Sequence, residues 1–249
     1  GVGLHPSHFL ALGALGRVHR TCLTALTTVL VVSNMGCGVV SMDATTSSFS
    51  NGRAIAVAVE PGYRSVLAFA EMTLEDAASV VSDRSEHTQG LWREKVDQYT
   101  TKHTYRHTIV SEEAQIVSCP KILNSFIGRS ARIEEATILN STILANPNSN
   151  DVEVEVSTVV DSGCVVEHSI VQWGCRCSSL ALVSGSFMCA ASSVDRHAKL
   201  INSILGPCSG ASQGEINASL VGCDHTCTCR VIVLLRNAQA NTCCSAGRS

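Results

Sequence analysis

The feature that most restricts the fold of this chain is an internal repeat between residues 109 and 222. Apolar residues recur there at steps of five or six, which matches neither the helical period nor the alternation of a single strand. Short strands joined by corners, three to a coil, need such a step because each flat side of the coil supplies one inward residue. The predicted inward positions are Ile116, Ile122, Ile127, Ile133, Ile138, Ile143, Val160, Val166, Val171, Cys177, Leu182, Met188, Val194, Leu200 and Leu205.

Polar and small residues follow the same repeat and mark its corners. Short polar pairs recur close to the apolar positions, at Asn124-Ser125, Asn140-Ser141, His168-Ser169, Asn202-Ser203 and Ala218-Ser219. Such side chains can bond the backbone at a corner or stack between coils. A glycine after an apolar position, as in Leu205-Gly206, suggests a corner with positive φ. The repeat predicts about 18 residues per coil and five or six coils.

The rest of the chain divides into shorter regions. Residues 1–72 form an irregular α/β segment, residues 73–107 a helical linker, residues 108–235 the solenoid and residues 236–249 a tail. Within the linker, Thr73 and Asp76 form a capping box, and Ser85 can cap a second helix. On that helix Trp92, Val96, Tyr99 and His103 share one face. This stripe either lines a ligand site or, as such stripes usually do, anchors the helix on its neighbour.

A loop interrupts the repeat. The run from Ala145 to Asp151 is rich in Asn, with Pro and Ser, and its composition is that of a loop. Loops at the corners of solenoids often build the functional surface. A passive insertion is an equally good interpretation, because solenoid corners accept extra residues freely.

Charge and cysteine content restrict the partners and the compartment. Lys and Arg total 18 against 21 Asp and Glu, which lacks the basic excess that binds nucleic acid. The unbroken apolar run Val29 to Val32 is far shorter than the ~20 residues that span a bilayer, so we expect no membrane partner. The cysteines number 13, so they cannot all pair with one another. We therefore expect reduced thiols in an intracellular, cytoplasmic protein.

The runs Asn124 to Gly128 and Asn202 to Pro207 carry a family resemblance. They resemble the hexapeptide-repeat superfamily of left-handed parallel β-helices, and in particular the C-terminal β-helices of sugar-phosphate nucleotidyltransferases. The stretch from Ser169 to Gly222, with Gln172-Trp173-Gly174, also resembles an uncharacterised group of β-helix proteins, DUF4954. The resemblance implies a mainly β fold, a left-handed parallel β-helix, and a homo-oligomer with a trimer favoured.

The nucleotidyltransferase resemblance stops short of the catalytic half. Those enzymes have a glycine-rich basic loop after their first strand, whereas no Lys or Arg closely follows Gly36-Cys37-Gly38 here. Nothing in residues 1–72 therefore predicts a positively charged phosphate cradle. We expect a β-helix module of the sugar-nucleotide-transferase type that serves assembly or ligand sensing, with a sugar nucleotide as a possible ligand.

The alternative is a hexapeptide-repeat acyltransferase that acts on a sugar or amine. The resemblance implies a histidine on a coil as general base, and His168 and His197 lie on the repeat. His197 is the better candidate, because Arg196 beside it could meet a phosphate of acetyl-CoA or another acyl donor. Both histidines could equally be surface residues at corners, since neither has a catalytic partner visible in the sequence.

A cysteine-rich stretch near the C-terminus raises the question of zinc. Cys223, His225, Cys227 and Cys229 are ligand types for zinc, but their spacing departs from paired Cys-x2-Cys knuckles. We predict no metal site, and no cofactor follows from the residues themselves.

Overall fold

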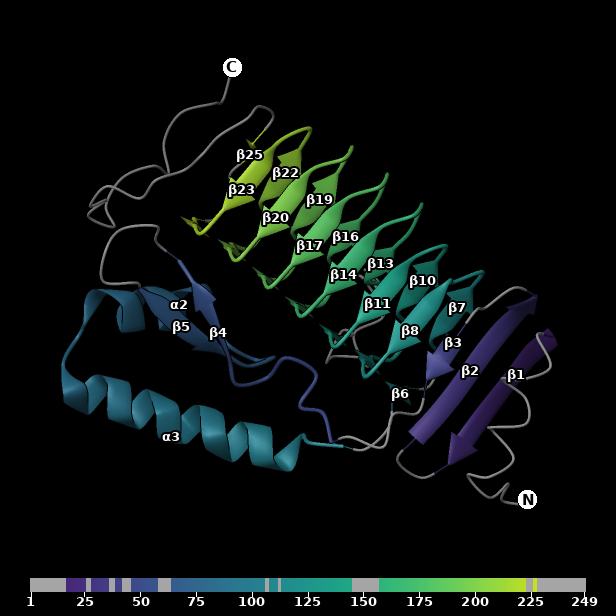
Figure 1. Ribbon diagram of the computed structural model, residues 1–249, viewed down its shortest axis with the longest axis horizontal. Coiled ribbons are helices and arrows are strands. Elements are labelled where there is room, and N and C mark those ends of the chain that lie inside the picture. Colours follow the sequence, from purple (N-terminus) through teal and green to yellow (C-terminus); the bar gives the residue numbers. More distant parts are fainter. Residues whose placement is uncertain are drawn as a thin grey trace, which may run out of the picture.

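The computed structural model describes residues 17–25, 28–35, 39–41, 46–57, 64–105, 108–111, 113–144, 157–222 and 226–227. It is a mainly β structure, a parallel β-solenoid of about six turns with three flat faces (Figure 1). The helices within these residues are α2 (Leu74–Ser82) and α3 (Glu86–Lys102). The parallel solenoid predicted from the repeat is therefore confirmed. Its left-handedness stays a prediction.

Each face of the solenoid is one sheet, and we number the faces in chain order. Face one contains β6 (Ile109–Val110), β9 (Phe126–Ile127), β12 (Thr142–Ile143), β15 (Ile170–Val171), β18 (Phe187–Met188), β21 (Ile204–Leu205) and β24 (Leu220–Val221). Face two contains β7 (Gln115–Val117), β10 (Arg132–Glu134), β13 (Val159–Val160), β16 (Arg176–Cys177), β19 (Ser193–Asp195), β22 (Gly210–Ser212) and β25 (Thr226–Cys227). Face three contains β8 (Lys121–Leu123), β11 (Thr137–Leu139), β14 (Val165–Glu167), β17 (Leu182–Ser184), β20 (Lys199–Ile201) and β23 (Glu215–Asn217).

Aligned side chains fill the interior of the solenoid. Ile127 pairs with Ile143 in the next coil, and Met188 pairs with Leu205, so these coils take 16 and 17 residues. The buried cluster runs from Val110 to Val221 and contains the predicted inward positions with one exception.

The exception is Leu182, where the prediction was wrong by one residue. Val183 is the buried residue of β17, whereas Leu182 is half-exposed on the outer side of face three. The corner before it, Ser179-Leu180, takes two left-handed residues and sets the spacing from Cys177 to Val183 at six. Because Leu182 and Val183 are both aliphatic, the sequence pattern does not show which of them points inward.

A ladder of buried serines forms the corner between faces three and one. Ser125, Ser141, Ser169, Ser186, Ser203 and Ser219 are each at most 1% exposed. From Ser141 onward, the amide of each serine donates to the hydroxyl oxygen of the preceding one over 3.0–3.2 Å. Each hydroxyl donates to the carbonyl two residues earlier in its own coil. The predicted stacking between coils is confirmed.

The prediction of positive φ at Gly206 was wrong. The left-handed glycines of the described solenoid are Gly163, Gly174 and Gly185. A Cβ at Gly206 would lie 2.3 Å from the carbonyl oxygen of Gly222 in the next coil. Glycine is needed at position 206 because the next coil approaches closely, not because the chain turns there.

The N-terminal end of the solenoid is extended by other strands. On face one, β2 (Thr28–Met35) pairs antiparallel with β6, and β1 (Arg17–Ala25) pairs with β2. On face three, β3 (Val39–Ser41) pairs parallel with β8.

A two-layer subdomain covers face one. The antiparallel strands β4 (Arg53–Ala56) and β5 (Ser65–Ala68) and both helices contribute to a second buried cluster with Ile170, Phe187 and Ile204, the outward residues of face one. The side-chain amide of Gln172 hydrogen-bonds this subdomain to face one, because its Nε2 donates to the carbonyls of Ala70 and Met72 at 3.0 and 2.9 Å.

The helices begin where the sequence predicts. Thr73 and Asp76 form a reciprocal capping box, and Ser85 caps α3. The Trp92 stripe anchors α3 on its neighbour, since Trp92 is buried and its Nε1 donates to the carbonyl of Leu67 at 3.0 Å. This helix does not cap an end of the solenoid. α3 packs on β5 and α2 at the flank, where Trp92 contacts the ring of Phe69 (Figure 1).

Candidate functional site

His197 lies at a corner between faces two and three. Arg196 and His197 both have left-handed φ, 51° and 62°, and together they turn the chain from β19 into β20. The amide of His197 donates to the carbonyl of Ser179 at 2.9 Å, which holds the turn against the preceding coil. Both side chains are exposed. The arrangement fits a corner residue, and it leaves the imidazole accessible to solvent.

His168 lies at the other edge of face three, where the chain passes from β14 into β15. Its φ is 50°, and Asn124, Asn140 and Asn202 take the same corner position with φ of 45–46°. The imidazole is exposed. The strands of face three run from the His197 corner to the His168 corner, so the structure does not bring the two histidines together.

The acidic neighbours do not orient either imidazole. Glu167 Oε1 accepts a hydrogen bond from Ser184 Oγ at 2.8 Å, on face three. Asp195 points outward on face two, and its Oδ1 has no hydrogen-bond partner among the described residues. On the same face Asp161 lies 3.8 Å from Arg176, which is largely exposed. Neither histidine therefore forms a catalytic dyad with the carboxylate next to it in the sequence.

The buried thiols among the described residues are packing groups. Cys164, Cys175 and Cys177 lie inside the solenoid, whereas Cys189 is buried between face one and the subdomain. Burial raises the pKa of Cys164 and of Cys175 to about 11. Desolvation also raises the pKa values of Cys177 and Cys189. At neutral pH these thiols stay protonated and unreactive. Cys208, at an exposed corner, is the accessible thiol of the described residues.

Within the described part of the chain, no group of three His, Cys, Asp or Glu side chains is placed to hold a metal ion. The cysteine-rich stretch from Cys223 to Cys229 lies outside the described residues except for the backbone of β25. In the same part of the chain, no helix is long and apolar enough to cross a membrane.

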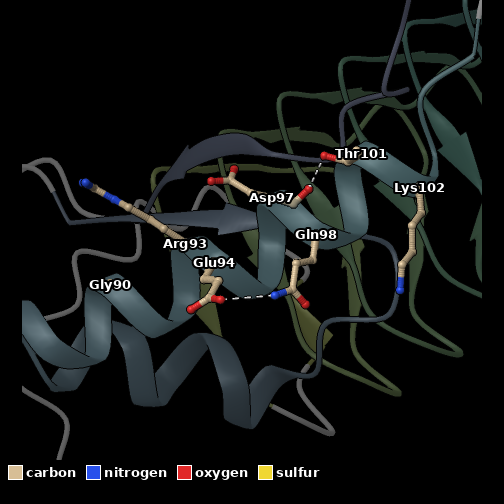
Figure 2. Close-up of a pocket in the computed structure, with 7 residues that line it drawn as sticks. All are labelled: Gly90, Arg93, Glu94, Asp97, Gln98, Thr101 and Lys102. Atoms are coloured by element: carbon tan, nitrogen blue, oxygen red, sulfur yellow. Dashed lines mark hydrogen bonds between the residues drawn. The ribbon is translucent and has the colours of Figure 1, made fainter.

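A shallow groove follows the outer side of α3 (Figure 2). Its lining consists of Gly90, Arg93, Glu94, Asp97, Gln98, Thr101 and Lys102. Gln98 donates to Glu94 Oε1 at 3.3 Å, and Thr101 Oγ1 donates to the carbonyl of Asp97 at 2.8 Å. Such i, i+4 contacts are those of a solvated helix face. The groove lies on the opposite side of α3 from the buried Trp92 and contains neither candidate histidine.

Comparison with known families decides the classification. The family described as Domain of unknown function (DUF4954) matches residues 29–239, most of the chain. The chain belongs to this family. The DUF4954 match spans β2 from Val29 onward, β3, the subdomain on face one and the whole solenoid, whereas β1 lies outside it. No curated protein and no solved structure matched the chain.

Two residues of this DUF4954 chain matter more than the sequence suggested. Leu180 is 57% exposed and stands at the same corner position as Gly163 and His197. An exposed leucine has no periodic signal, and only alignment of the coils shows where it lies. Gln172 belongs to the motif Gln172-Trp173-Gly174, but its hydrogen bond to the subdomain is made with Met72, 100 positions away in the sequence.

Proposed function

We propose that this chain is an assembly module, a rigid solenoid whose faces bind protein surfaces, including those of further copies of itself. The observation that carries the proposal is the way face one is used within the chain. Its outward residues Ile170, Phe187 and Ile204 are at most 1% exposed beneath the subdomain. A flat parallel sheet with aligned apolar side chains thus already serves as a docking platform.

The chemistry of this contact supports a binding role. The subdomain is held by apolar burial together with a few directed hydrogen bonds, such as those of Gln172 and of Thr142, whose Oγ1 donates to the carbonyl of Phe49 at 2.7 Å. Protein interfaces combine an apolar centre with a small number of hydrogen bonds in the same way. Resemblance to the β-helices of sugar-phosphate nucleotidyltransferases favours the same role and implies a homo-oligomer.

Self-association is tested by light scattering on the whole chain at micromolar concentration. An oligomer mass supports the proposal, and a mass of 26.3 kDa, that of one chain, at every concentration contradicts self-assembly. Isothermal titration with UDP-N-acetylglucosamine in the same buffer tests ligand sensing separately. A binding heat that saturates during the titration would show that the module also binds a sugar nucleotide.

The acyltransferase alternative rests on the exposed imidazole of His197 beside Arg196. It is tested by thiol release from acetyl-CoA in the presence of amino sugars. Turnover that falls about 100-fold in His197→Ala, the usual scale for a general base, would favour the enzyme. Turnover that His197→Ala leaves unchanged would remove this residue from any catalytic role.

A further inference from the structure

Face three of the described solenoid mixes aliphatic with polar outward residues and has no described layer packed on it. Its half-buried aliphatic residues are Leu123, Leu139, Val165, Leu182 and Ile201, and its polar ones are Lys121, Thr137, Glu167, Ser184, Lys199, Glu215 and Asn217. Face two presents charged and hydroxyl side chains at many of the equivalent positions, among them Arg132, Glu134, Arg176, Ser193 and Asp195.

Leu180 adds an exposed anchor at the edge of this face. Its φ of 61° is unfavourable for a leucine, and its side chain is 57% exposed. The side chain leans over the preceding coil, where its Cδ2 lies 2.6 Å from the position that a Cβ on Gly163 would take. Neither the backbone strain nor the exposure of Leu180 benefits an isolated chain, and a contact with a second molecule would give both a function.

The pattern of face three is complementary to itself in one orientation. A two-fold axis parallel to the strands, between β14 and β17, places β8 opposite β23 of a second copy, β11 opposite β20, and β14 opposite β17. Because strand direction is kept, first positions then meet first positions. Lys121 of each copy faces Glu215 of the other in the outermost of these six strands, and β3 lies beyond Lys121 in the same sheet.

The centre of the face is complementary in the same orientation. Val165 faces Leu182 of the second copy there, and the two Leu180 side chains stand beside the axis. Leu139 faces Ile201 between the centre and each end. In the same register Glu167 faces Ser184 beside the axis and Lys199 faces Thr137. Apolar pairs therefore alternate with pairs that can hydrogen-bond, and opposite charges meet in the outermost of the paired strands, a mixture typical of protein interfaces.

The other two-fold orientation is poorer. An axis parallel to the solenoid places each coil opposite its own copy and brings first positions against last positions. Lys121 would then face Leu123 of the second copy, and Lys199 would face Ile201. Each contact removes an ammonium group from water without a partner, which costs free energy.

We infer that face three is the surface through which two copies of this chain associate, with their solenoids antiparallel. The inference rests on the proposed assembly function and names the surface and the partner. Six strands spaced about 4.8 Å apart make the face about 29 Å long, and about five residues give a width of about 16 Å. A contact of roughly 450 Å² per copy, about 900 Å² in total, is smaller than a stable interface needs, so the dimer is weak and dissociates at low concentration.

The decisive variant is Leu180→Asn, measured by analytical ultracentrifugation of the whole chain over a concentration series. Asparagine tolerates a left-handed φ, so the variant should fold at least as stably as the natural chain. Leu91→Asn is the matched control, because Leu91 is equally exposed, at 56%, but lies on α3. We expect Leu180→Asn to raise the dimer dissociation constant at least tenfold, Leu91→Asn to leave it unchanged, and a thermal melt to show both variants folded.

A charge exchange tests the orientation. Lys121→Glu should weaken the dimer, because it brings two carboxylates together at each end, and Lys121→Glu combined with Glu215→Lys should restore it. Failure of the double variant to recover would overturn the antiparallel pairing. A trimer, or a dimer that Leu180→Asn leaves intact, would overturn the use of face three while self-assembly stands. A chain that stays monomeric would overturn self-assembly and this inference with it.

Discussion

The serine ladder allows a prediction whose magnitude follows from its hydrogen bonds. Ser186 Oγ accepts the amide hydrogen of Ser203 at 3.1 Å and donates to the carbonyls of Ser184 and Leu200 at 2.8 and 3.1 Å. In Ser186→Ala the carbonyl of Ser184 keeps the amide of Asn202 as its donor at 2.9 Å. The amide of Ser203 loses its acceptor in a site that is fully buried.

A buried amide without an acceptor costs about 1–3 kcal/mol, so we expect Ser186→Ala to lower the free energy of unfolding by about 2 kcal/mol. For a chain of this size that corresponds to a fall in Tm of roughly 4–8 °C. Circular dichroism gives both quantities, by thermal melting and by urea unfolding.

The control is Ser184→Ala on the outer side of face three. Its hydroxyl donates to Glu167 Oε1 at a partly buried position, so its loss should cost about 0.5–1 kcal/mol. Equal stability of Ser186→Ala and Ser184→Ala would refute the view that the ladder stabilises the corner by satisfying buried amides.

Four further predictions follow from the same contacts. Ile133→Asp places a charge in the solenoid core and should destabilise the fold by about 3 kcal/mol or more, as seen in a thermal melt. Gln172→Leu leaves the buried carbonyls of the subdomain without their donor, so hydrogen exchange in α2 and β5 should accelerate while the distal coils stay protected. Gly90→Ala should stabilise α3 by up to about 1 kcal/mol in urea unfolding, because a Cβ there meets open space. Burial raises the pKa of Cys164 and of Cys175 from an ordinary value near 9 to about 11, so their contribution to stability is complete below pH 9 and is lost as pH rises through 11. The urea concentration at the unfolding midpoint should therefore decrease as pH is raised from 8.5 to 10.5. An unchanged midpoint would contradict this assignment.

The fold was largely readable from the sequence because one residue per face must point inward in every coil. That requirement located Ile133 and Met188 correctly, and it failed at Leu182 only because Val183 is also aliphatic. The role of Gly206 could not be read, since the atom that excludes a side chain belongs to the next coil. Close approach between coils is a tertiary property, and a local turn signal does not report it.

The candidate site was less readable than the fold. The sequence supplied His168 and His197 as chemically suitable residues, but their placement at opposite edges of face three follows from the coil register. No sequence pattern distinguishes Leu180, because exposed leucines are common and follow no period. Its significance depends on the left-handed turn and on Gly163 in the preceding coil, which are visible only once the coils are aligned.

The two apolar faces of the solenoid can be compared directly, because both present aliphatic or aromatic residues in the same middle coils. On face one Phe187 and Ile204 are covered by the subdomain and are fully buried. On face three the neighbouring residues Leu182 and Ile201 remain half-exposed within the described structure. A coil needs only its inward residue to fold, so outward aliphatic side chains do not serve the solenoid core. On face one the outward aliphatic side chains pack against the subdomain. On face three the inferred second copy of the chain would pack against them in the same way.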